Sequence, residues 1–285
     1  MIKGINYWAF PPDRNGNPFP LIDAMKYARD LGYDSFEPTV DGEGSPLALS
    51  TSQGDVEAFR KAADDIGIKI ITVASGLAWG ASPTDPNVAV RRKACENTKQ
   101  VLTIASWLGA ETILYLPGMV SAVFVPDFTP QPYDKVDEWA RESMREILPT
   151  AEETGVRIGI ENVWNRFLLS PLEMKNFIDS FDSPYVGSYF DVGNCMLYGH
   201  PEQWIDILGE RIFAVHMKDF RVGVGNLDGF VDLLAGDVDF VSVLQAFKRV
   251  GYSGQFGVEY VPPTLGAAEK GIASMKLIEK MYGEV

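Results

Sequence analysis

Cysteine and histidine are both scarce in this chain, which has two of each among its 285 residues. Two cysteines are too few for a disulfide framework in a chain of this length, and we therefore expect the protein in a reducing cytoplasm. Cys195 follows Asp191 by four residues and could be read as a soft metal ligand. We favour the alternative, a small buried thiol, because free cysteine usually behaves as a small hydrophobic residue.

Basic residues and long hydrophobic runs are also in short supply. Acidic residues outnumber basic ones, 39 to 25, and the formal net charge is −14. Such a surface repels phosphate backbones and gives no reason to expect binding to anionic membranes. The N-terminus has no apolar stretch of signal-peptide length, and no run approaches the length of a transmembrane helix. The composition therefore argues against nucleic acid and membranes as partners.

Hydrophobic residues, in contrast, make up 46% of the chain, which is enough for a large core. Short apolar runs alternate with longer amphipathic ones, and glycines mark most ends of the longer runs. The short runs, expected to be strands, are 3–8, 34–37, 69–74, 112–116, 157–161, 186–191, 212–216 and 255–259. The longer runs, expected to be helices, are 21–31, 55–66, 85–109, 133–153, one starting at 170, 200–208, 239–251 and 265–281.

Three of the expected helices carry recognisable start signals. Asp85 with Pro86, Ser170 with Glu173, and Asp239 have the form of N-caps. Strands that are apolar on both faces and alternate with helices are typical of a parallel sheet covered by helices. Eight such units, with no linker or change in composition, predict a single (β/α)8 TIM barrel domain over residues 1–285.

A doubly wound open sheet is the alternative architecture. It would require a glycine-rich turn after the first strand to bind a dinucleotide. The sequence there is Trp8-Ala9-Phe10-Pro11-Pro12, which contains no glycine. We therefore prefer the barrel.

Four consecutive expected strands end at a residue that can bind a metal. These residues are Glu161, Asp191, His216 and Glu259. The C-terminal ends of all strands in a TIM barrel open on one face, and neighbouring strands lie about 4.8 Å apart. The four side chains can therefore converge on one ion. Three carboxylates and one imidazole suit Mn²⁺, Mg²⁺ or Co²⁺, with Zn²⁺ as an alternative.

Such a site suits proton transfer on a sugar. A divalent ion can hold a carbonyl and the adjacent hydroxyl in one chelate and stabilise the charge that develops when a neighbouring carbon loses its proton. Glu161 and Glu259 could stand on opposite faces of the sugar, one removing the proton and the other returning one. Return to the same carbon gives epimerisation, and return to the neighbouring carbon gives aldose–ketose isomerisation.

Five segments of the second half carry the motifs around the predicted ligands: GIENVWNRFLLSP, SYFDVGNC, AVHMKDF, LLAGDVDF and GYSGQFGVEY. These segments resemble xylose-isomerase-like TIM barrels, and among them the sugar phosphate isomerases/epimerases. That group includes L-ribulose/L-xylulose 5-phosphate 3-epimerases, D-tagatose/D-psicose 3-epimerases and inosose dehydratases. The resemblance implies an enzyme of carbohydrate metabolism that binds Mn²⁺ or a similar ion. It also implies that Glu161, Asp191, His216 and Glu259 hold the ion and that the two glutamates transfer the proton.

The sequence departs from the tagatose/psicose epimerases at three positions. Asn194 stands where they have a second histidine, Phe167 where they have a further glutamate, and Val222 where they have an arginine, with Arg221 one place earlier. The DVGN and HMKD forms are more similar to the sugar phosphate epimerases. A dense basic cluster for a phosphate is nevertheless missing, since only Arg166, Lys218 and Arg221 are near the predicted site.

Seven residues are candidate substrate contacts because they lie at or just beyond the expected strand ends. They are Lys218, Asn194, Asn165, Trp164, Arg221, Glu37 and Trp8. Trp79 has a similar position. Aromatic faces suit the C–H faces of a sugar, although packing at the barrel mouth is an equal alternative for each tryptophan.

The leading hypothesis is a metal-dependent sugar or sugar-phosphate 3-epimerase that acts on a small molecule. An isomerase or an inosose-type dehydratase could use the same site. A phosphodiesterase of the endonuclease IV type would need a histidine-rich zinc cluster, which two histidines do not provide. A non-catalytic sugar sensor is a third alternative. The sequence leaves open the sugar, its phosphorylation and whether the chain forms a homo-oligomer.

Overall fold

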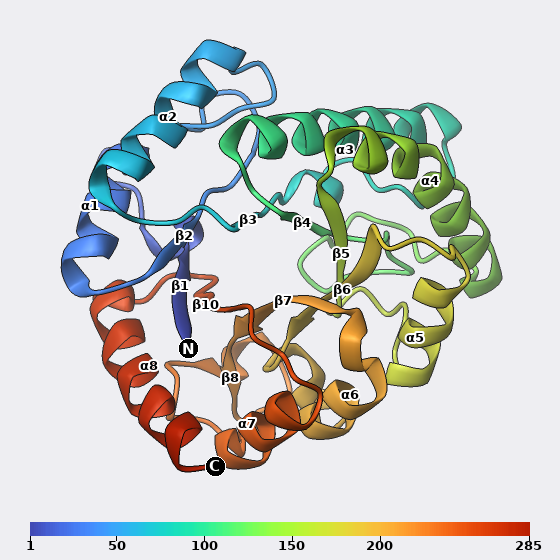
Figure 1. The fold of residues 1–285 in the computed structure, drawn as a ribbon. Helices are drawn as coiled ribbons and strands as arrows, with labels where there is room; N and C mark the ends of the chain where they lie inside the picture. Colours follow the sequence, from blue (N-terminus) through green and yellow to red (C-terminus); the bar gives the residue numbers. More distant parts are fainter.

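The computed structural model describes residues 1–285 and forms a nearly closed barrel of eight parallel strands (Figure 1). Most of these strands are buried along their whole length, as expected for a sheet that helices cover on the outside. The strands are β1 (Ile2–Asn6), β2 (Ser35–Glu37), β3 (Thr72–Val73), β4 (Thr112–Tyr115), β5 (Arg157–Glu161), β6 (Val186–Asp191), β7 (Ile212–Met217) and β10 (Gln255–Val258). The predicted TIM barrel is confirmed.

The order of the strands in the sheet is β2-β1-β10-β7-β6-β5-β4-β3. Parallel bridges from Ser35 to Lys69 and from Thr39 to Ala74 join the two outer strands. β3 is shorter than the expected run 69–74, because residues on either side of it make these single bridges instead of a continuous ladder. The four strands that end in candidate ligands, β5, β6, β7 and β10, are neighbours in the barrel wall.

Eight helices surround the barrel (Figure 1). Their apolar faces pack on the outside of the strands. The helices are α1 (Leu21–Leu31), α2 (Gln53–Ile66), α3 (Val88–Leu108), α4 (Tyr133–Thr154), α5 (Pro171–Asp179), α6 (Pro201–Leu208), α7 (Phe240–Arg249) and α8 (Ala267–Glu284). None of the helices combines the length and the apolar character that crossing a membrane requires.

Two of the three expected N-caps are confirmed. The Ser170 hydroxyl accepts a hydrogen bond from the Glu173 amide at the start of α5, and Asp239 accepts from Val241 and Ser242 at the start of α7. The expected cap at Asp85 is wrong by two residues. Asp85 instead accepts a hydrogen bond from the Asn87 amide in a turn, and Asn87 caps α3.

The loop after β7 contains a short hairpin that the sequence did not indicate. Its strands are β8 (Asp219–Phe220) and β9 (Phe230–Val231), which pair antiparallel. The buried Asp219 carboxylate accepts hydrogen bonds from the amides of Phe220, Gly236 and Val238. This carboxylate therefore fixes the loop beside the mouth of the barrel and is not free to contact a substrate.

Candidate active site and metal centre

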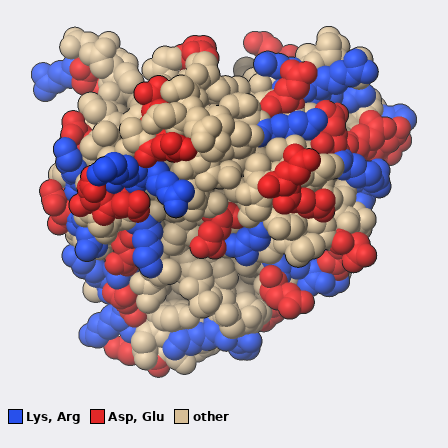
Figure 2. Space-filling model, turned by 45° about the horizontal axis from the view of Figure 1, so that its top comes forward, with Lys and Arg blue, Asp and Glu red and all other residues tan.

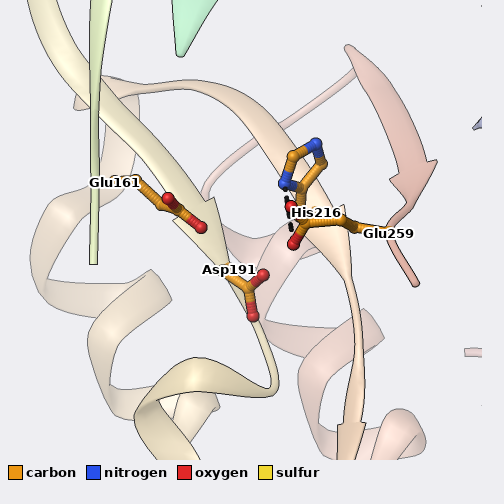
Figure 3. Close-up of side chains that lie close together, drawn as sticks. All are labelled: Glu161, Asp191, His216 and Glu259. Carbon is orange, nitrogen blue, oxygen red and sulfur yellow. Dashed lines mark ion pairs between the residues drawn. The ribbon is translucent and has the colours of Figure 1, made fainter. Parts of the chain in front are cut away.

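The four predicted ligands come together at one end of the barrel. Glu161 and Asp191 are the last residues of β5 and β6, His216 lies near the end of β7, and Glu259 follows β10. One ligand atom from each lies within 4.8 Å of the others (Figure 3). All four side chains are buried.

The charges of this cluster are not balanced by the protein. Lys218 forms ion pairs with Glu259 and with Oδ2 of Asp191, the latter at 3.4 Å. When Glu161, Asp191 and Glu259 are all ionised, as metal ligands are, this one ammonium leaves two negative charges uncompensated. Asp191 Oδ2 and His216 Nδ1 also have no hydrogen-bond partner. Buried, unpaired ligand atoms of this kind fit a divalent cation, so the cluster is a candidate metal centre.

Glu37 sets the orientation of His216. Its carboxylate lies 2.7 Å from His216 Nε2 and also accepts hydrogen bonds from the Tyr189 hydroxyl and the Asn6 amide. These donors and the positive charge of His216 hold the pKa of Glu37 below its usual value despite burial, which acts in the opposite direction. A proton on Nε2 leaves Nδ1 free to face the cluster. A carboxylate on the far nitrogen is the usual partner of a metal-binding histidine.

Replacing Glu37 with glutamine is expected to weaken metal binding by about 10- to 100-fold, as for other partners of ligating histidines. The amide has the same shape but no charge to hold the proton on Nε2. Calorimetric titration with Mn²⁺ measures the effect. The exposed Glu43→Gln is the matched control, since Glu43 lies in the loop after β2 and its carboxylate accepts a hydrogen bond from the Ser50 hydroxyl. Equal affinity in both variants would contradict this role of Glu37.

Two asparagines position the carboxylates at the ends of β5 and β6. Asn162 exchanges two hydrogen bonds of 2.8 Å with the backbone of Asp191, which ties these two strand ends together. Asn194 donates its backbone N–H to Asp191 Oδ1 at 2.8 Å and its side-chain amide to Glu161 Oε1 at 3.1 Å. The Trp164 indole in turn donates to the Asn194 carbonyl. The Asn194 side chain therefore belongs to the ligand cluster.

Gly193 allows Lys218 to reach this cluster. A Cβ at position 193 would lie 2.6 Å from Cβ of Lys218, which is too close for any side chain. The DVGN segment therefore has a glycine at this position because the ends of two strands approach each other closely here.

The two glutamates have opposite protonation tendencies. Burial favours the neutral form of both carboxyl groups. For Glu161, burial and the nearby charge of Glu259 raise the pKa well above its usual value. For Glu259, Lys218 and His216 outweigh burial and lower the pKa. In the metal-free protein Glu161 therefore holds a proton more tightly than Glu259 does.

Metal binding is expected to weaken as the pH falls. Burial lowers the pKa of His216, but the charges of Glu37 and Glu259 outweigh it and raise this pKa to about 9. Below that value Nδ1 carries a proton that the ion must displace, so the apparent affinity should fall about tenfold for each unit of pH. Titration with Mn²⁺ at pH 6, 7 and 8, in buffers of different ionisation enthalpy, measures both the slope and the released proton. An affinity that is flat over this range would contradict the expectation.

A cavity of about 1100 Å³ opens above the cluster. Glu161 and Glu259 line it, whereas Asp191 and His216 lie beneath its wall. Four of the expected substrate contacts also line it, and these are Trp8, Trp164, Asn194 and Lys218.

The structure does not bring the other three expected contacts to the cavity. Glu37 lies inside the barrel against His216. Asn165 is fully buried and its amide is engaged with the Gly118 carbonyl and the Phe167 N–H. The Arg221 guanidinium donates a hydrogen bond to the Ala235 carbonyl within the hairpin loop. Cys195 is the buried thiol that we favoured, and its sulfur contacts the Val192 carbonyl.

Sequence reasoning missed Asp41 and Phe124, which line the opposite side of the cavity. Asp41 follows β2 and accepts hydrogen bonds from the Trp8 indole and the Gly76 amide. Phe124 packs edge to face on Trp79 with 4.6 Å between the ring centres. The metal ligands were predicted because each ends an apolar run. Neither Asp41 nor Phe124 ends such a run, so this pattern does not indicate them.

Comparisons with known proteins agree with the barrel fold. Uncharacterized protein MJ1311 of Methanocaldococcus jannaschii is 27% identical over 85% of this chain and 80% of its own length. SgbU of Escherichia coli strain K12, provisionally named an L-ribulose-5-phosphate 3-epimerase, is 28% identical over 83% of this chain and 82% of its own. The crystal structure of a D-tagatose 3-epimerase-like protein superposes with a TM-score of 0.79 at 21% identity, covering 100% of this chain and 99% of that one. The model of the xylose isomerase-like TIM barrel family matches residues 25–278, and the chain belongs to that family.

Proposed function

We propose that the protein is a divalent-metal-dependent epimerase that inverts the carbon next to the carbonyl of a keto sugar. The observation that carries this proposal is the placement of Glu161 and Glu259. They come from the two outer strands of the ligand-bearing set, β5 and β10, and both line the cavity. A sugar bound between them would present its two faces to different carboxyl groups.

The four strand-end residues would hold the ion. Most of their donor atoms are oxygens, which suit Mn²⁺, Co²⁺ or Mg²⁺. Zn²⁺ is also compatible with this set. When bound, the ion supplies a positive charge that stabilises the oxygen of the sugar as its neighbouring carbon is deprotonated.

The glutamates divide the proton transfer between them. We assign to Glu259 the role of accepting the proton from carbon, because Lys218 and His216 lower its pKa in the metal-free protein. Glu161, whose pKa is raised there by burial and by Glu259, returns a proton to the opposite face of the same carbon. One C–H bond breaks, one forms with inverted configuration, and the pair exchanges its protonation state, so the reverse reaction uses the same groups in opposite roles.

Lys218 and Asn194 keep this pair in place. The Lys218 ammonium contacts Glu259, and the Asn194 amide contacts Glu161. Both side chains also line the cavity, where a bound sugar would contact them. The name of SgbU, which describes a 3-epimerase, supports the choice of reaction.

The test is to incubate the Mn²⁺-loaded protein with ketoses in D2O and to follow the products by NMR. We expect deuterium at the carbon next to the carbonyl together with the epimeric ketose. An aldose product would assign isomerisation instead. Inertness of every ketose and of its phosphate, with metal demonstrably bound, would refute the proposal.

A further inference from the structure

The cavity is much larger than one sugar ring. If each of its roughly twelve non-hydrogen atoms takes a generous volume of about 30 Å³, a hexose needs about 360 Å³. The cavity holds about 1100 Å³. A monosaccharide bound at Glu161 and Glu259 would therefore leave most of the space beyond it unfilled.

The space beyond the metal end has its own lining. The loops after the first four barrel strands form it, opposite the strands that carry the ligands. Trp8 follows β1, Asp41 follows β2, Trp79 follows β3 and Phe124 follows β4. Indole and phenyl rings present apolar faces that suit the C–H faces of a sugar ring, and a carboxylate such as Asp41 accepts hydrogen bonds from hydroxyl groups.

The lining does not suit a phosphate. Lys218 is the only cation among the lining residues, and its ammonium is already engaged by carboxylates, whereas Asp41, Glu161 and Glu259 are acidic. On the face shown in Figure 2, basic side chains are interspersed with acidic ones and do not gather into a patch.

The usual phosphate site of a TIM barrel is also altered here. That site is commonly built from the loops after the seventh and eighth strands. The residues that these loops add to the cavity beyond Lys218 and Glu259 have no charged side chain, and they are Leu227, Phe230, Val261, Pro262 and Pro263. The first turn of the nearby α8 carries Glu269, whose charge repels an anion from the helix N-terminus.

We propose that the substrate is an uncharged sugar that carries a second ring, such as a glycosyl group, and no phosphate. The reacting sugar lies at Glu161 and Glu259, and the second ring lies against Trp8, Asp41 and Trp79. This inference rests on the proposed epimerase function and specifies its substrate class.

A matched series of three ketoses tests the inference. D-fructose, D-fructose 6-phosphate and isomaltulose share one ketose, and the last two carry a phosphate or a glucosyl group on the same oxygen. The rate of deuterium incorporation next to the ketone, measured by NMR with the Mn²⁺-loaded protein, gives kcat/KM for each. We expect kcat/KM for isomaltulose to be about tenfold or more above that for fructose, because its second ring can pack on an aromatic side chain. We expect kcat/KM for fructose 6-phosphate to be lower than that for fructose.

Trp79→Ala should bring the ratio of kcat/KM for isomaltulose to kcat/KM for fructose close to one. Trp139→Ala is the matched control, because Trp139 lies on α4 under Arg91 and outside the cavity. Preference for the phosphate, or an equal loss for all three sugars in Trp79→Ala, would overturn the inference while the epimerase function stood. Inertness of these three sugars and of every other ketose tested for the proposed function would remove that function and the inference together.

Discussion

Glu259→Gln is expected to lower the rate of epimerisation by about 10²- to 10⁴-fold, the range that loss of one general base produces. Glutamine keeps the size of the side chain and one oxygen ligand, but it cannot accept a proton from carbon. Glu161→Gln should cause a loss of similar size, because the second carboxyl group is equally necessary for inversion. Both rates follow from NMR of a ketose and its epimer under saturating Mn²⁺.

The two variants should differ in how they exchange hydrogen with solvent. Each keeps one working carboxyl group, so each should still exchange the proton of one epimer in D2O without converting it to the other. The two variants should exchange opposite epimers. Loss of exchange with the same epimer in both would show that only one glutamate acts as a base. Full activity in either variant would show that the assignment of the pair is wrong.

Asp191→Ala is expected to reduce metal affinity on the order of a thousandfold, since a site of four ligands distributes a binding energy of about 10–16 kcal/mol among them. Activity should fall with the loss of metal. Asp191 is fully buried beside Glu259, so its removal relieves repulsion between the two carboxylates, which offsets the loss of its ion pair with Lys218 and its hydrogen bond from Asn194. The metal-free variant should therefore unfold at a temperature close to that of the metal-free parent.

The exposed Asp206→Asn is a suitable control for Asp191→Ala, because Asp206 only pairs with Arg249 on the outer surface. It should bind metal and turn over substrate like the parent. Retained metal in Asp191→Ala would contradict the ligand assignment. A large drop in the unfolding temperature of the metal-free variant would instead assign a structural role to this carboxylate.

The barrel and its ligand cluster could be predicted from the sequence because both follow from local patterns. Parallel strands buried on two faces appear as short apolar runs, and their ends mark one side of the barrel. Glu161, Asp191 and His216 lie at the ends of such runs, so topology alone brings them together. The boundary of α3 was less certain, because Asp85 and Asn87 are both good caps and only the turn between them decides which one starts the helix.

Other parts of the site depend on contacts between distant segments, which no local pattern records. Glu37 ends a strand as the ligands do, yet it lies across the barrel interior and holds His216 instead of reaching the cavity. Asn165 has the residue type of a sugar contact, but the backbone of its own loop engages its amide. The size of the cavity and the contact of Trp79 with Phe124 depend on how four separate loops fold over the barrel.

The metal content of the purified protein tests the central claim most directly. The protein would be equilibrated with Mn²⁺, Co²⁺, Mg²⁺ or Zn²⁺, freed of excess ion and measured by elemental analysis beside His216→Ala. About one ion per chain in the parent and almost none in the variant is the result that a strand-end site requires. No ion in the parent, or equal amounts in both proteins, would mean that Glu161, Asp191, His216 and Glu259 do not form a metal centre, and the epimerase proposal would fall with it.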